Sequence, residues 1–416
     1  MAGTCKRSFG FTVNFGVAPL SIAVMRLNGV PPSREDLPLR ALVTDVHLRS
    51  AVAGLRALGA AGTEVLALAP SWLGAGLRSR HARGRAAGPD AVADPAGFAA
   101  RVGALGAEFG PLVVYPGQEA AIDALLAAPR PLLDKLALPY SSPESLKAVR
   151  DKRSLAELCA GVGLRAPKTL FEGTAAELLE GRISPPFMLK PARPGGTLGS
   201  AAPVGFEHEL RTRLVGMPPD EPLLVQKCTP GPLTAVALVL DRAGRVVSRF
   251  QQEARRTWPP EAGPSSLAVS VPPDEDLVTR SARLLAEAGY SGLAELQFVG
   301  NGRSRELIDV NPRFYGSLPL ALAAGVNLPA AWHANVTGAP TPSPGHYRVG
   351  VTYRWLEADF SAALRGSPRL LLDRARSPRT GSMWASDDPL ASVFLAASAA
   401  GARIRRRLPK CHRVAT

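Results

Sequence analysis

Short apolar runs alternate with helical patterns in the first part of the chain. The runs ALVTD, TEVLALAP and PLVVYP read as strands, at residues 41–45, 63–70 and 111–116. RSAVAGLRALGAAG, AGFAARVGALGAEFG and QEAAIDALLAA carry apolar residues at the spacing of an amphipathic helix. Strands that alternate with helices indicate a parallel, doubly wound sheet. We therefore expect a doubly wound α/β domain over residues 39–145, an irregular extension over 1–38, and a loop in the Gly- and Arg-rich stretch 73–90.

The pattern then changes to strands, hairpins and separate helices. Residues 141–163 are strongly helical, with Ser142 as the expected N-cap and Pro143 at the first helical position. The further elements expected are strands at 185–191 and 222–231, a hairpin at 234–250, a helix at 274–289, strands at 292–299 and 305–310, and an Ala-rich helix from 317. Residues 343–416 predict a strand followed by a basic helical tail.

One strand of this second part carries a polar face. ELIDVNPRFYGS places Asp309, Asn311 and Arg313 at every second position of an apolar run, so the three side chains share a face. GLAELQF adds Glu295 and Gln297, which join this face if the two strands pair antiparallel. Oxygen ligands on neighbouring strands suit Mg²⁺, and an arginine beside them could neutralise a phosphoryl oxygen. The alternative is a solvated polar face.

The turn between these two strands decides whether the acid and the amide meet. Asn301-Gly302 is a strong signal for a two-residue hairpin turn, which would place Gln297 opposite Glu306 and turn Asp309 to the other face. A longer loop, centred near Arg303, would place Gln297 opposite Asp309. The metal site requires the longer loop, and this is the loop that we expect.

A lysine and a glycine-rich loop could serve the same anionic ligand. Lys190 lies inside an apolar strand, where an unpaired charge is costly, so it needs a partner or must reach solvent from an edge strand. ARPGGTLGS follows directly, and glycines let backbone N–H groups converge on a phosphate. An ordinary surface loop is the alternative for the glycines.

Two acids of the first domain also have alternative roles. Asp45 ends the first strand, where it could contact a ligand or cap the next helix. Glu119 could line a substrate pocket or lie on a helix surface.

Composition and charge narrow the class of protein. The 416 residues suffice for two or three domains, and the 46% hydrophobic and 20% charged residues are ordinary for a folded protein. The net charge of +14 makes nucleic-acid binding a hypothesis to consider. The arginines are scattered along the chain, however, so we expect no nucleic-acid partner. The four cysteines lack metal-ligand spacing and suit a reducing cytoplasm, and no apolar run is long enough to span a membrane.

Several of these segments together resemble the ATP-grasp superfamily. They are a strand ending in LKP, the glycine-rich loop, VQK followed by PG, and LQF with LIDVNPRFYGSLPLALAAGVNLP. Within the superfamily the chain looks most like carbamoyl-phosphate-synthase-like ATP-grasp proteins. The resemblance implies an ATP-grasp domain over 146–342, with subdomains at 146–221 and 222–342, after a Rossmann-like domain. ATP would lie between the subdomains.

The resemblance also implies roles for individual residues, carried over by position. The residues expected to bind ATP are Lys152, Lys190, Gly195, Gly196, Thr197, Gly199, Gln226, Lys227 and Cys228. The lysines at 152 and 190 would contact phosphates, the glycines and threonine would form a phosphate flap, and the last three residues would line the adenine. The expected Mg²⁺ ligands (with Mn²⁺ as a possible substitute) are Gln297, Asp309 and Asn311. Arg313, with Arg255 or Arg256, would stabilise the transferred phosphoryl group.

The function that the resemblance implies is an ATP- and Mg²⁺-dependent ligase in the cytoplasm, with a possible homodimer as its assembly. Such an enzyme converts a small-molecule carboxylate into an acyl phosphate, which an amine, or a thiol, attacks. Gln297, Lys227 and Leu233 stand where the superfamily usually has acids, which leaves a non-catalytic or regulatory ATP-binding protein as a second hypothesis. Formation of carbamoyl or acyl phosphate without the amine step is a third.

Overall fold

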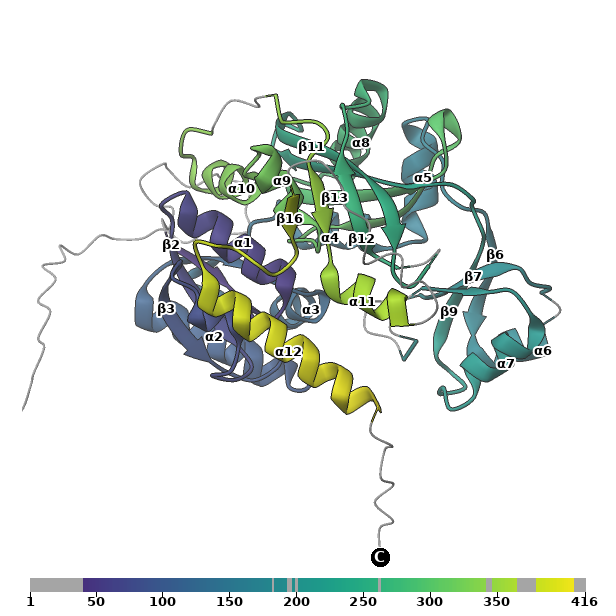
Figure 1. Cartoon of the computed structure of the whole chain (residues 1–416), viewed down its shortest axis with the longest axis horizontal. Helices are drawn as coiled ribbons and strands as arrows, with labels where there is room; N and C mark the ends of the chain where they lie inside the picture. The colour runs from purple at the N-terminus through teal and green to yellow at the C-terminus, as the bar shows by residue number, and fades with distance from the viewer. Residues whose placement is uncertain are drawn as a thin grey trace, which may run out of the picture.

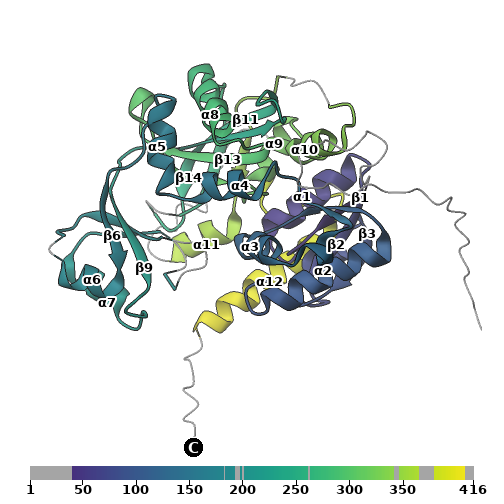
Figure 2. The same cartoon turned by 180° about the vertical axis from the view of Figure 1, so that it is seen from behind.

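Three β-sheets organise the part of the chain that the computed structural model describes (Figure 1). That part comprises residues 40–181, 183–192, 197–198, 201–260, 263–341, 346–364 and 379–407, so the expected extension over 1–38 lies outside it. The sheet formed within residues 169–227 stands apart at one end of the molecule, and the other two sheets lie closer together. Figure 2 shows the same arrangement from behind.

The N-terminal sheet is parallel and doubly wound, as the alternating pattern predicts. Its strands are β1 (Arg40–Val43), β2 (Glu64–Ala69), β3 (Ala82–Ala87), β4 (Leu112–Tyr115) and β5 (Leu136–Ala137), in the order β3-β2-β1-β4-β5. The helices that follow are α1 (Arg49–Ala60), α2 (Pro95–Phe109) and α3 (Glu119–Ala127), with 3-10 turns η1 (Ala75–Arg78) and η2 (Arg130–Leu133). Strand order reverses between β1 and β4, which is the topological switch point where such sheets bind ligands.

The expected loop at 73–90 contains a strand that the prediction missed. β3 alternates buried Ala82 and Ala86 with exposed Arg83 and Arg85, and it lies at the edge of the sheet. β3 is an edge strand with its buried apolar residues on one face only. The arginines on its other face interrupt the apolar run by which the other strands of this sheet were predicted.

The middle sheet is antiparallel and has a small core of its own. Two helices, α4 (Pro143–Arg150) and α5 (Ser154–Gly161), lead into it and make up the helical segment expected over 141–163. The sheet order is β6 (Thr169–Thr174), β9 (Pro222–Lys227), β7 (Phe187–Pro191), β8 (Ala202–Val204), with α6 (Ala175–Glu180) and α7 (Glu207–Leu214) packed on it. Because β9 pairs with β6 and β7, this subdomain reaches Lys227, beyond the boundary expected at 221.

The third sheet has seven strands. Their order is β14 (Glu306–Asn311), β13 (Gly292–Val299), β10 (Leu233–Leu240), β11 (Val246–Thr257), β12 (Ser265–Ser270), β15 (Thr352–Arg354), β16 (Arg379–Gly381). The helices connected to this sheet are α8 (Glu275–Glu287), α9 (Leu318–Ala324), α10 (Leu328–Thr337) and α11 (Leu356–Leu364), and η3 (Gly302–Ser304) joins β13 to β14. The strand expected after residue 343 therefore extends this sheet rather than a separate tail.

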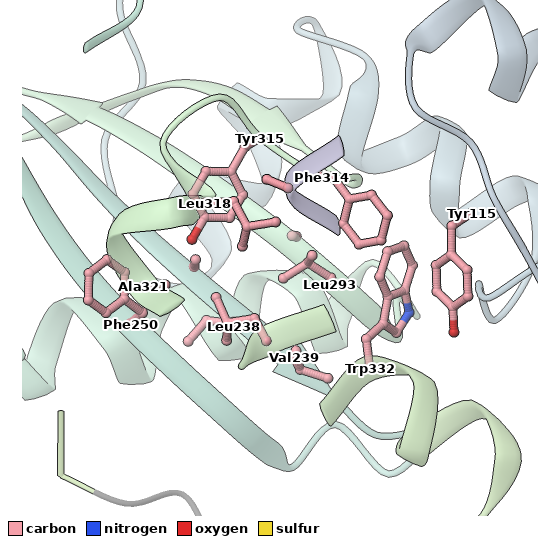
Figure 3. Close-up of a cluster of buried hydrophobic side chains, with 14 of the residues drawn as sticks. Tyr115, Leu238, Val239, Phe250, Leu293, Phe314, Tyr315, Leu318, Ala321 and Trp332 are labelled. Carbon is pink, nitrogen blue, oxygen red and sulfur yellow. The ribbon is translucent and has the colours of Figure 1, made fainter. Parts of the chain in front are cut away.

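Aromatic side chains join the N-terminal domain to the seven-stranded sheet. Tyr115, at the end of β4, packs edge-on against Trp332 of α10, with ring centroids 4.8 Å apart, and Phe314 contacts the same indole at 5.7 Å (Figure 3). All three rings are buried, and the Tyr115 hydroxyl is 2.9 Å from Nδ1 of His333. The two domains thus share one continuous core.

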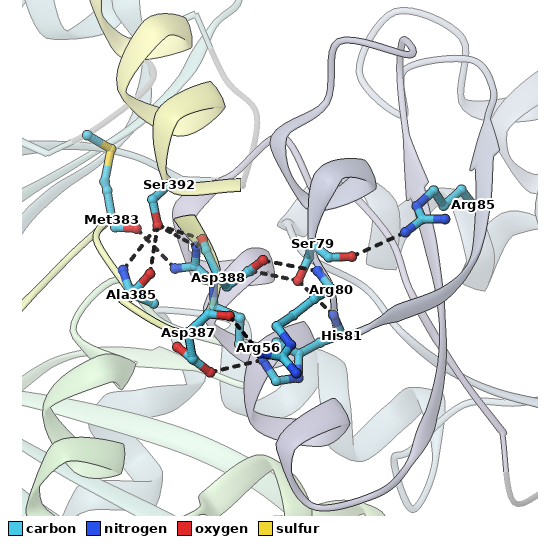
Figure 4. A network of polar contacts seen from close by, with 10 residues as sticks. All are labelled: Arg56, Ser79, Arg80, His81, Arg85, Met383, Ala385, Asp387, Asp388 and Ser392. Atoms are coloured by element: carbon cyan, nitrogen blue, oxygen red, sulfur yellow. Dashed lines mark hydrogen bonds and ion pairs between the residues drawn. The ribbon is translucent and has the colours of Figure 1, made fainter. Parts of the chain in front are cut away.

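The C-terminal helix α12 (Pro389–Arg407) folds back onto the N-terminal domain (Figures 1 and 2). Asp388, immediately before it, is 1% exposed and accepts hydrogen bonds from Arg56 Nε at 2.8 Å, Ser79 Oγ at 2.7 Å and the Arg80 amide at 3.0 Å (Figure 4). Arg56 also donates to Ser392 Oγ at 3.0 Å. These contacts fasten the expected basic helix to the first domain. Across the described residues, no helix is both long and apolar enough to cross a bilayer.

Candidate functional site

The longer loop between β13 and β14 is confirmed. Gln297 pairs with Asp309 and Glu295 pairs with Asn311, so the four side chains lie on one face of the sheet. Near the turn, Val299 pairs with Glu306, and a bulge at Ile308 then shifts the register by one residue. Without the bulge Asp309 would face the opposite side.

Ile308, the extra residue of the bulge, also accepts a hydrogen bond from Lys190 of the middle sheet. Lys190 Nζ, on β7, donates a 3.2 Å hydrogen bond to the backbone carbonyl of Ile308. The side chain is 5% exposed, so burial lowers the pKa of Lys190 to about 8, although Asp309 opposes and Lys152 reinforces the change. Lys152 and Asp309 therefore both lie within electrostatic reach of the Lys190 ammonium. The buried lysine bridges the two subdomains between which ATP is expected.

Asp309 and Gln297 leave oxygen atoms without partners. The Asp309 carboxylate makes no hydrogen bond or ion pair with any other described residue, and neither does Oε1 of Gln297. Both side chains are half-buried, and their unpaired oxygen atoms are not among the fully buried ones, so a cation can reach them. Unpaired, half-buried oxygen atoms opposite one another fit a hard divalent cation. No cluster of three His, Cys, Asp or Glu side chains suited to a metal occurs in the described residues, so a site here must use the amide oxygens.

Glu295 lies directly beside the expected metal ligands. It is 3% exposed, and its Oε2 accepts hydrogen bonds from Gln297 Nε2 at 3.1 Å and Asn311 Nδ2 at 3.2 Å. Burial raises the pKa of Glu295 to about 7 against the opposing effects of these bonds and of Arg313. The sequence placed Glu295 on this face but gave it no role among the ligands.

Arg313 is held by the N-terminal domain. Its Nε donates to Oε1 of Glu119 at 2.8 Å and its Nη2 donates to Oδ1 of Asn311 at 3.1 Å. Oε2 of Glu119 accepts from Arg150 Nε at 2.6 Å, and Arg150 also binds Asp123 at 2.8 and 3.0 Å. Burial raises the pKa of Glu119, but the two arginines outweigh it and hold that pKa below its usual range. A polar chain thus runs from α3 to the candidate metal ligands.

The switch point of the parallel sheet lies next to this chain. Asp45, just after β1, is buried and has φ 57°, a left-handed conformation that is uncommon outside glycine. Its carboxylate accepts hydrogen bonds from the Gly117 amide at 3.1 Å and Gln118 Nε2 at 2.7 Å, and burial raises its pKa. The capping role expected for Asp45 is wrong, because α1 has Leu48 at its N-cap and no side-chain cap.

Besides Lys190, four of the expected ATP-binding residues lie on the middle sheet or next to it. Gln226 is 5% exposed in β9, beside Met188 of β7, and its Oε1 has no hydrogen-bond partner. Lys227 is exposed at the end of the same strand, and Cys228 is half-buried beyond it. Thr197 is bound to Glu221 through its amide at 2.7 Å and its hydroxyl at 2.9 Å. The expected flap residues Gly195, Gly196 and Gly199 lie outside the described residues.

Arg255 and Arg256 each form an ion pair with an acid that is not one of the candidate metal ligands. Arg256 makes a two-pronged ion pair with Asp359 of α11 at 2.9 and 2.8 Å, and that carboxylate is fully buried. Arg255 binds Glu253 at 2.8 Å and is more than half exposed. Their contribution to phosphoryl transfer stays a prediction, to which these contacts give no support.

Known proteins resemble this chain in sequence and in fold. Residues 220–359 match the family model described as "ATP-grasp in the biosynthetic pathway with Ter operon". The carbamoyl phosphate synthase large chain of Myxococcus xanthus (strain DK1622) is 28% identical over an alignment of 211 residues, and the match covers 47% of this chain and 19% of that protein. This chain therefore spans less than a quarter of the curated relative.

Two solved structures show the same fold at low identity. One is the biotin carboxylase domain of Hydrogenobacter thermophilus 2-oxoglutarate carboxylase, a dimer in complex with MgADP, ADP and bicarbonate; it has 16% identity and a TM-score of 0.57, and the match covers 76% of this chain and 74% of that one. The other is N5-carboxyaminoimidazole ribonucleotide synthetase from Thermus thermophilus, with 19% identity, a TM-score of 0.55 and coverage of 73% and 79%. Together with the sequence matches, they confirm the expected ATP-grasp fold: residues 220–359 match an ATP-grasp family model, and the chain resembles the carbamoyl phosphate synthase large chain in sequence.

Proposed function

We propose that this protein is an ATP- and Mg²⁺-dependent ligase that activates a substrate carboxylate as an acyl phosphate for attack by an amine. The observation that carries the proposal is the pairing of Gln297 with Asp309, with unpaired oxygen atoms that face Lys190 from the other subdomain. A triphosphate between the sheets would meet one buried ammonium group and one cation-binding edge. Charge neutralisation of this kind is the main requirement of phosphoryl transfer.

Asp309, Gln297 and Asn311 would hold Mg²⁺, or Mn²⁺ in its place. The bound cation would neutralise charge on the phosphates of ATP. One solved relative was crystallised with MgADP, which supports this choice of cofactor. Lys190 would leave the Ile308 carbonyl for a phosphate oxygen, and Lys152, close enough to affect its pKa, would add a second positive charge.

The base of the nucleotide would lie toward the end of β9. Gln226 Oε1 is a buried acceptor without a partner, and it fits a donor such as the exocyclic amine of adenine. Lys227 and Cys228 follow at the strand end and would contribute backbone groups.

Arg313 would stabilise the carboxylate end of the reaction. Glu119 now occupies its Nε, so a substrate carboxylate or acyl phosphate would share this guanidinium with Glu119 or displace it. The substrate would then lie between the N-terminal domain and β14, beside two switch-point residues, the buried Asp45 and the half-buried Gln118. One structural neighbour was solved with bicarbonate, a small carboxylate-like anion to try first.

The test follows ADP release from purified protein with ATP, Mg²⁺, bicarbonate and pooled carboxylates and amines. Asp309→Asn removes the only carboxylate of the proposed cation site, and we expect it to abolish turnover while ATP binding persists. ADP formation that needs a carboxylate but no amine would instead indicate an enzyme that forms an acyl or carbamoyl phosphate.

A non-catalytic ATP-binding protein is the second candidate, and the Arg313–Glu119 ion pair favours it, because the arginine is already neutralised. ATP binding without ADP release across broad pools would support this candidate. The relative's dimer also makes a homodimer worth testing by light scattering.

A further inference from the structure

Glu295 holds two amide side chains by the same oxygen atom. Gln297 Nε2 and Asn311 Nδ2, on adjacent strands, both donate to Oε2 of Glu295, at 3.1 and 3.2 Å. The carboxyl group is 3% exposed and lies on the face that also carries Asp309. One buried acid therefore contacts both of the amide ligands proposed for the cation.

An amide ligand works only in one of its two orientations. A cation binds the amide oxygen, and a rotation of the amide by half a turn would present the NH₂ group instead. An acceptor on one side of the amide fixes this choice, because only the NH₂ group can donate to it. With Glu295 Oε2 on the NH₂ groups, the oxygen atoms of Gln297 and Asn311 are left for other partners. Oδ1 of Asn311 accepts from Arg313, and Oε1 of Gln297 has no partner among the described residues.

We propose that Glu295 is a positioning residue, whose acceptor oxygen orients the amides of Gln297 and Asn311 so that their oxygens bind the divalent cation. This inference rests on the proposed metal–ATP site and adds the residue on which the site's geometry depends. It also explains how a cation-binding edge with one carboxylate and two amides can be well ordered. Outer contacts that orient metal ligands commonly change metal affinity by about 10- to 100-fold when removed.

Three roles for Glu295 predict different results for two substitutions. Glu295→Gln keeps one acceptor oxygen and loses the negative charge, whereas Glu295→Leu loses both. An orienting role predicts that the glutamine variant retains the cation affinity within about threefold and that the leucine variant loses about 10- to 100-fold. An electrostatic role or direct ligation predicts that both variants lose affinity, and a packing role predicts that neither does.

The experiment measures Mn²⁺ binding to the full chain in the presence of ATP, by the loss of the free Mn²⁺ signal in electron paramagnetic resonance. Gln252→Leu is the matched control, since Gln252 is also buried and polar, lies on the same face two strands away from Gln297, and contacts Ser317 rather than the amides. It should bind Mn²⁺ like the wild type. Equal affinity of the leucine variant and the wild type, or equal losses in both Glu295 variants, would overturn the proposal.

A second measurement does not depend on how the variants fold. In a crystal structure of the wild type with ATP and Mn²⁺, located by anomalous scattering, Glu295 should remain on the two NH₂ groups and away from the metal. Direct ligation of Mn²⁺ by Glu295 would refute the proposal. Absence of Mn²⁺ binding by the wild type would remove both this inference and the proposed site. Normal Mn²⁺ binding without ADP release would remove the ligase alone.

Discussion

The ion pair between Glu119 and Arg313 connects two domains, so its loss should be measurable without any knowledge of the substrate. Glu119→Gln is the informative substitution because the carboxylate accepts from Arg313 with one oxygen and from Arg150 with the other. A glutamine has one acceptor oxygen, and its NH₂ group must then face one of the two guanidinium groups. One arginine loses its acceptor, and both lose the negative charge between them.

The burial of the three side chains sets the magnitude. Arg150 is 6% exposed, Arg313 22% and Glu119 25%. Removal of one partner from a buried pair costs about 3–5 kcal/mol. Arg150 keeps Asp123, so we expect the lower end, about 3 kcal/mol, by the same reasoning. With about 2.1 cal/mol/K of unfolding entropy per residue, Tm should fall by about 3 °C if the whole chain unfolds together, and by more if the N-terminal domain melts alone.

Differential scanning calorimetry at neutral pH measures this change, with Glu253→Gln as the control. Glu253 pairs with Arg255, which is 56% exposed, so that variant should lose at most about 1 kcal/mol. The pKa of Glu119 is lowered, so the stabilisation is present above the usual carboxyl pKa and is lost as the pH falls through the lowered one. Equal Tm values for the two variants, or a difference that persists in strong acid, would refute the reasoning.

Three further predictions concern single side chains. Because the pKa of Lys190 is lowered to about 8, ATP should bind about tenfold more weakly per pH unit above this value until the pKa of the bound state is reached; Lys190→Met should abolish the dependence, and a flat wild-type profile by calorimetry would contradict it. Asp388→Ala removes the acceptor of Arg56, Ser79 and the Arg80 amide, so limited proteolysis should cut near α12 sooner than in the wild type, and unchanged cleavage would count against the attachment. Gln226→Leu removes a buried acceptor without a partner, so the ligand-free protein should gain about 1 kcal/mol of stability while ATP affinity falls, and a gain in both would exclude contact with the nucleotide.

Local patterns carried much of the fold. The doubly wound sheet, the Ser142 cap and the β10–β11 hairpin are confirmed. The sequence signals that predicted them each lie within a short segment of the chain. Elements whose pattern depends on distant partners were harder to predict. β9 lies in the middle sheet because β6 and β7 pair with it, and no signal within PLLVQK reveals those partners.

In the candidate site, too, features with a local sequence signal were predicted and contacts between distant residues were not. The sequence predicted that Gln297 would face Asp309 from the period of a strand and a longer loop, but the pairing also requires the bulge at Ile308, which was not predicted. It did not predict that Glu119 would hold Arg313, because the two residues are 194 positions apart. The hydrogen bonds of Glu295 to two amides were also missed, although its acid in the middle of an apolar strand was a signal that it needed polar partners.

The bulge at Ile308 ties the shape of the site to the length of the β13–β14 loop. One extra residue turns Asp309 toward Gln297, and the same residue offers its carbonyl to Lys190 of the other subdomain. Deletion of Ile308 would keep the pairing of Gln297 with Asp309 and remove the carbonyl, whereas a regular strand that retains Ile308 would lose the pairing. A change of register at this hairpin would therefore alter the proposed cation site or the contact of Lys190 with Ile308, and engineered loop exchanges should leave the bulge intact.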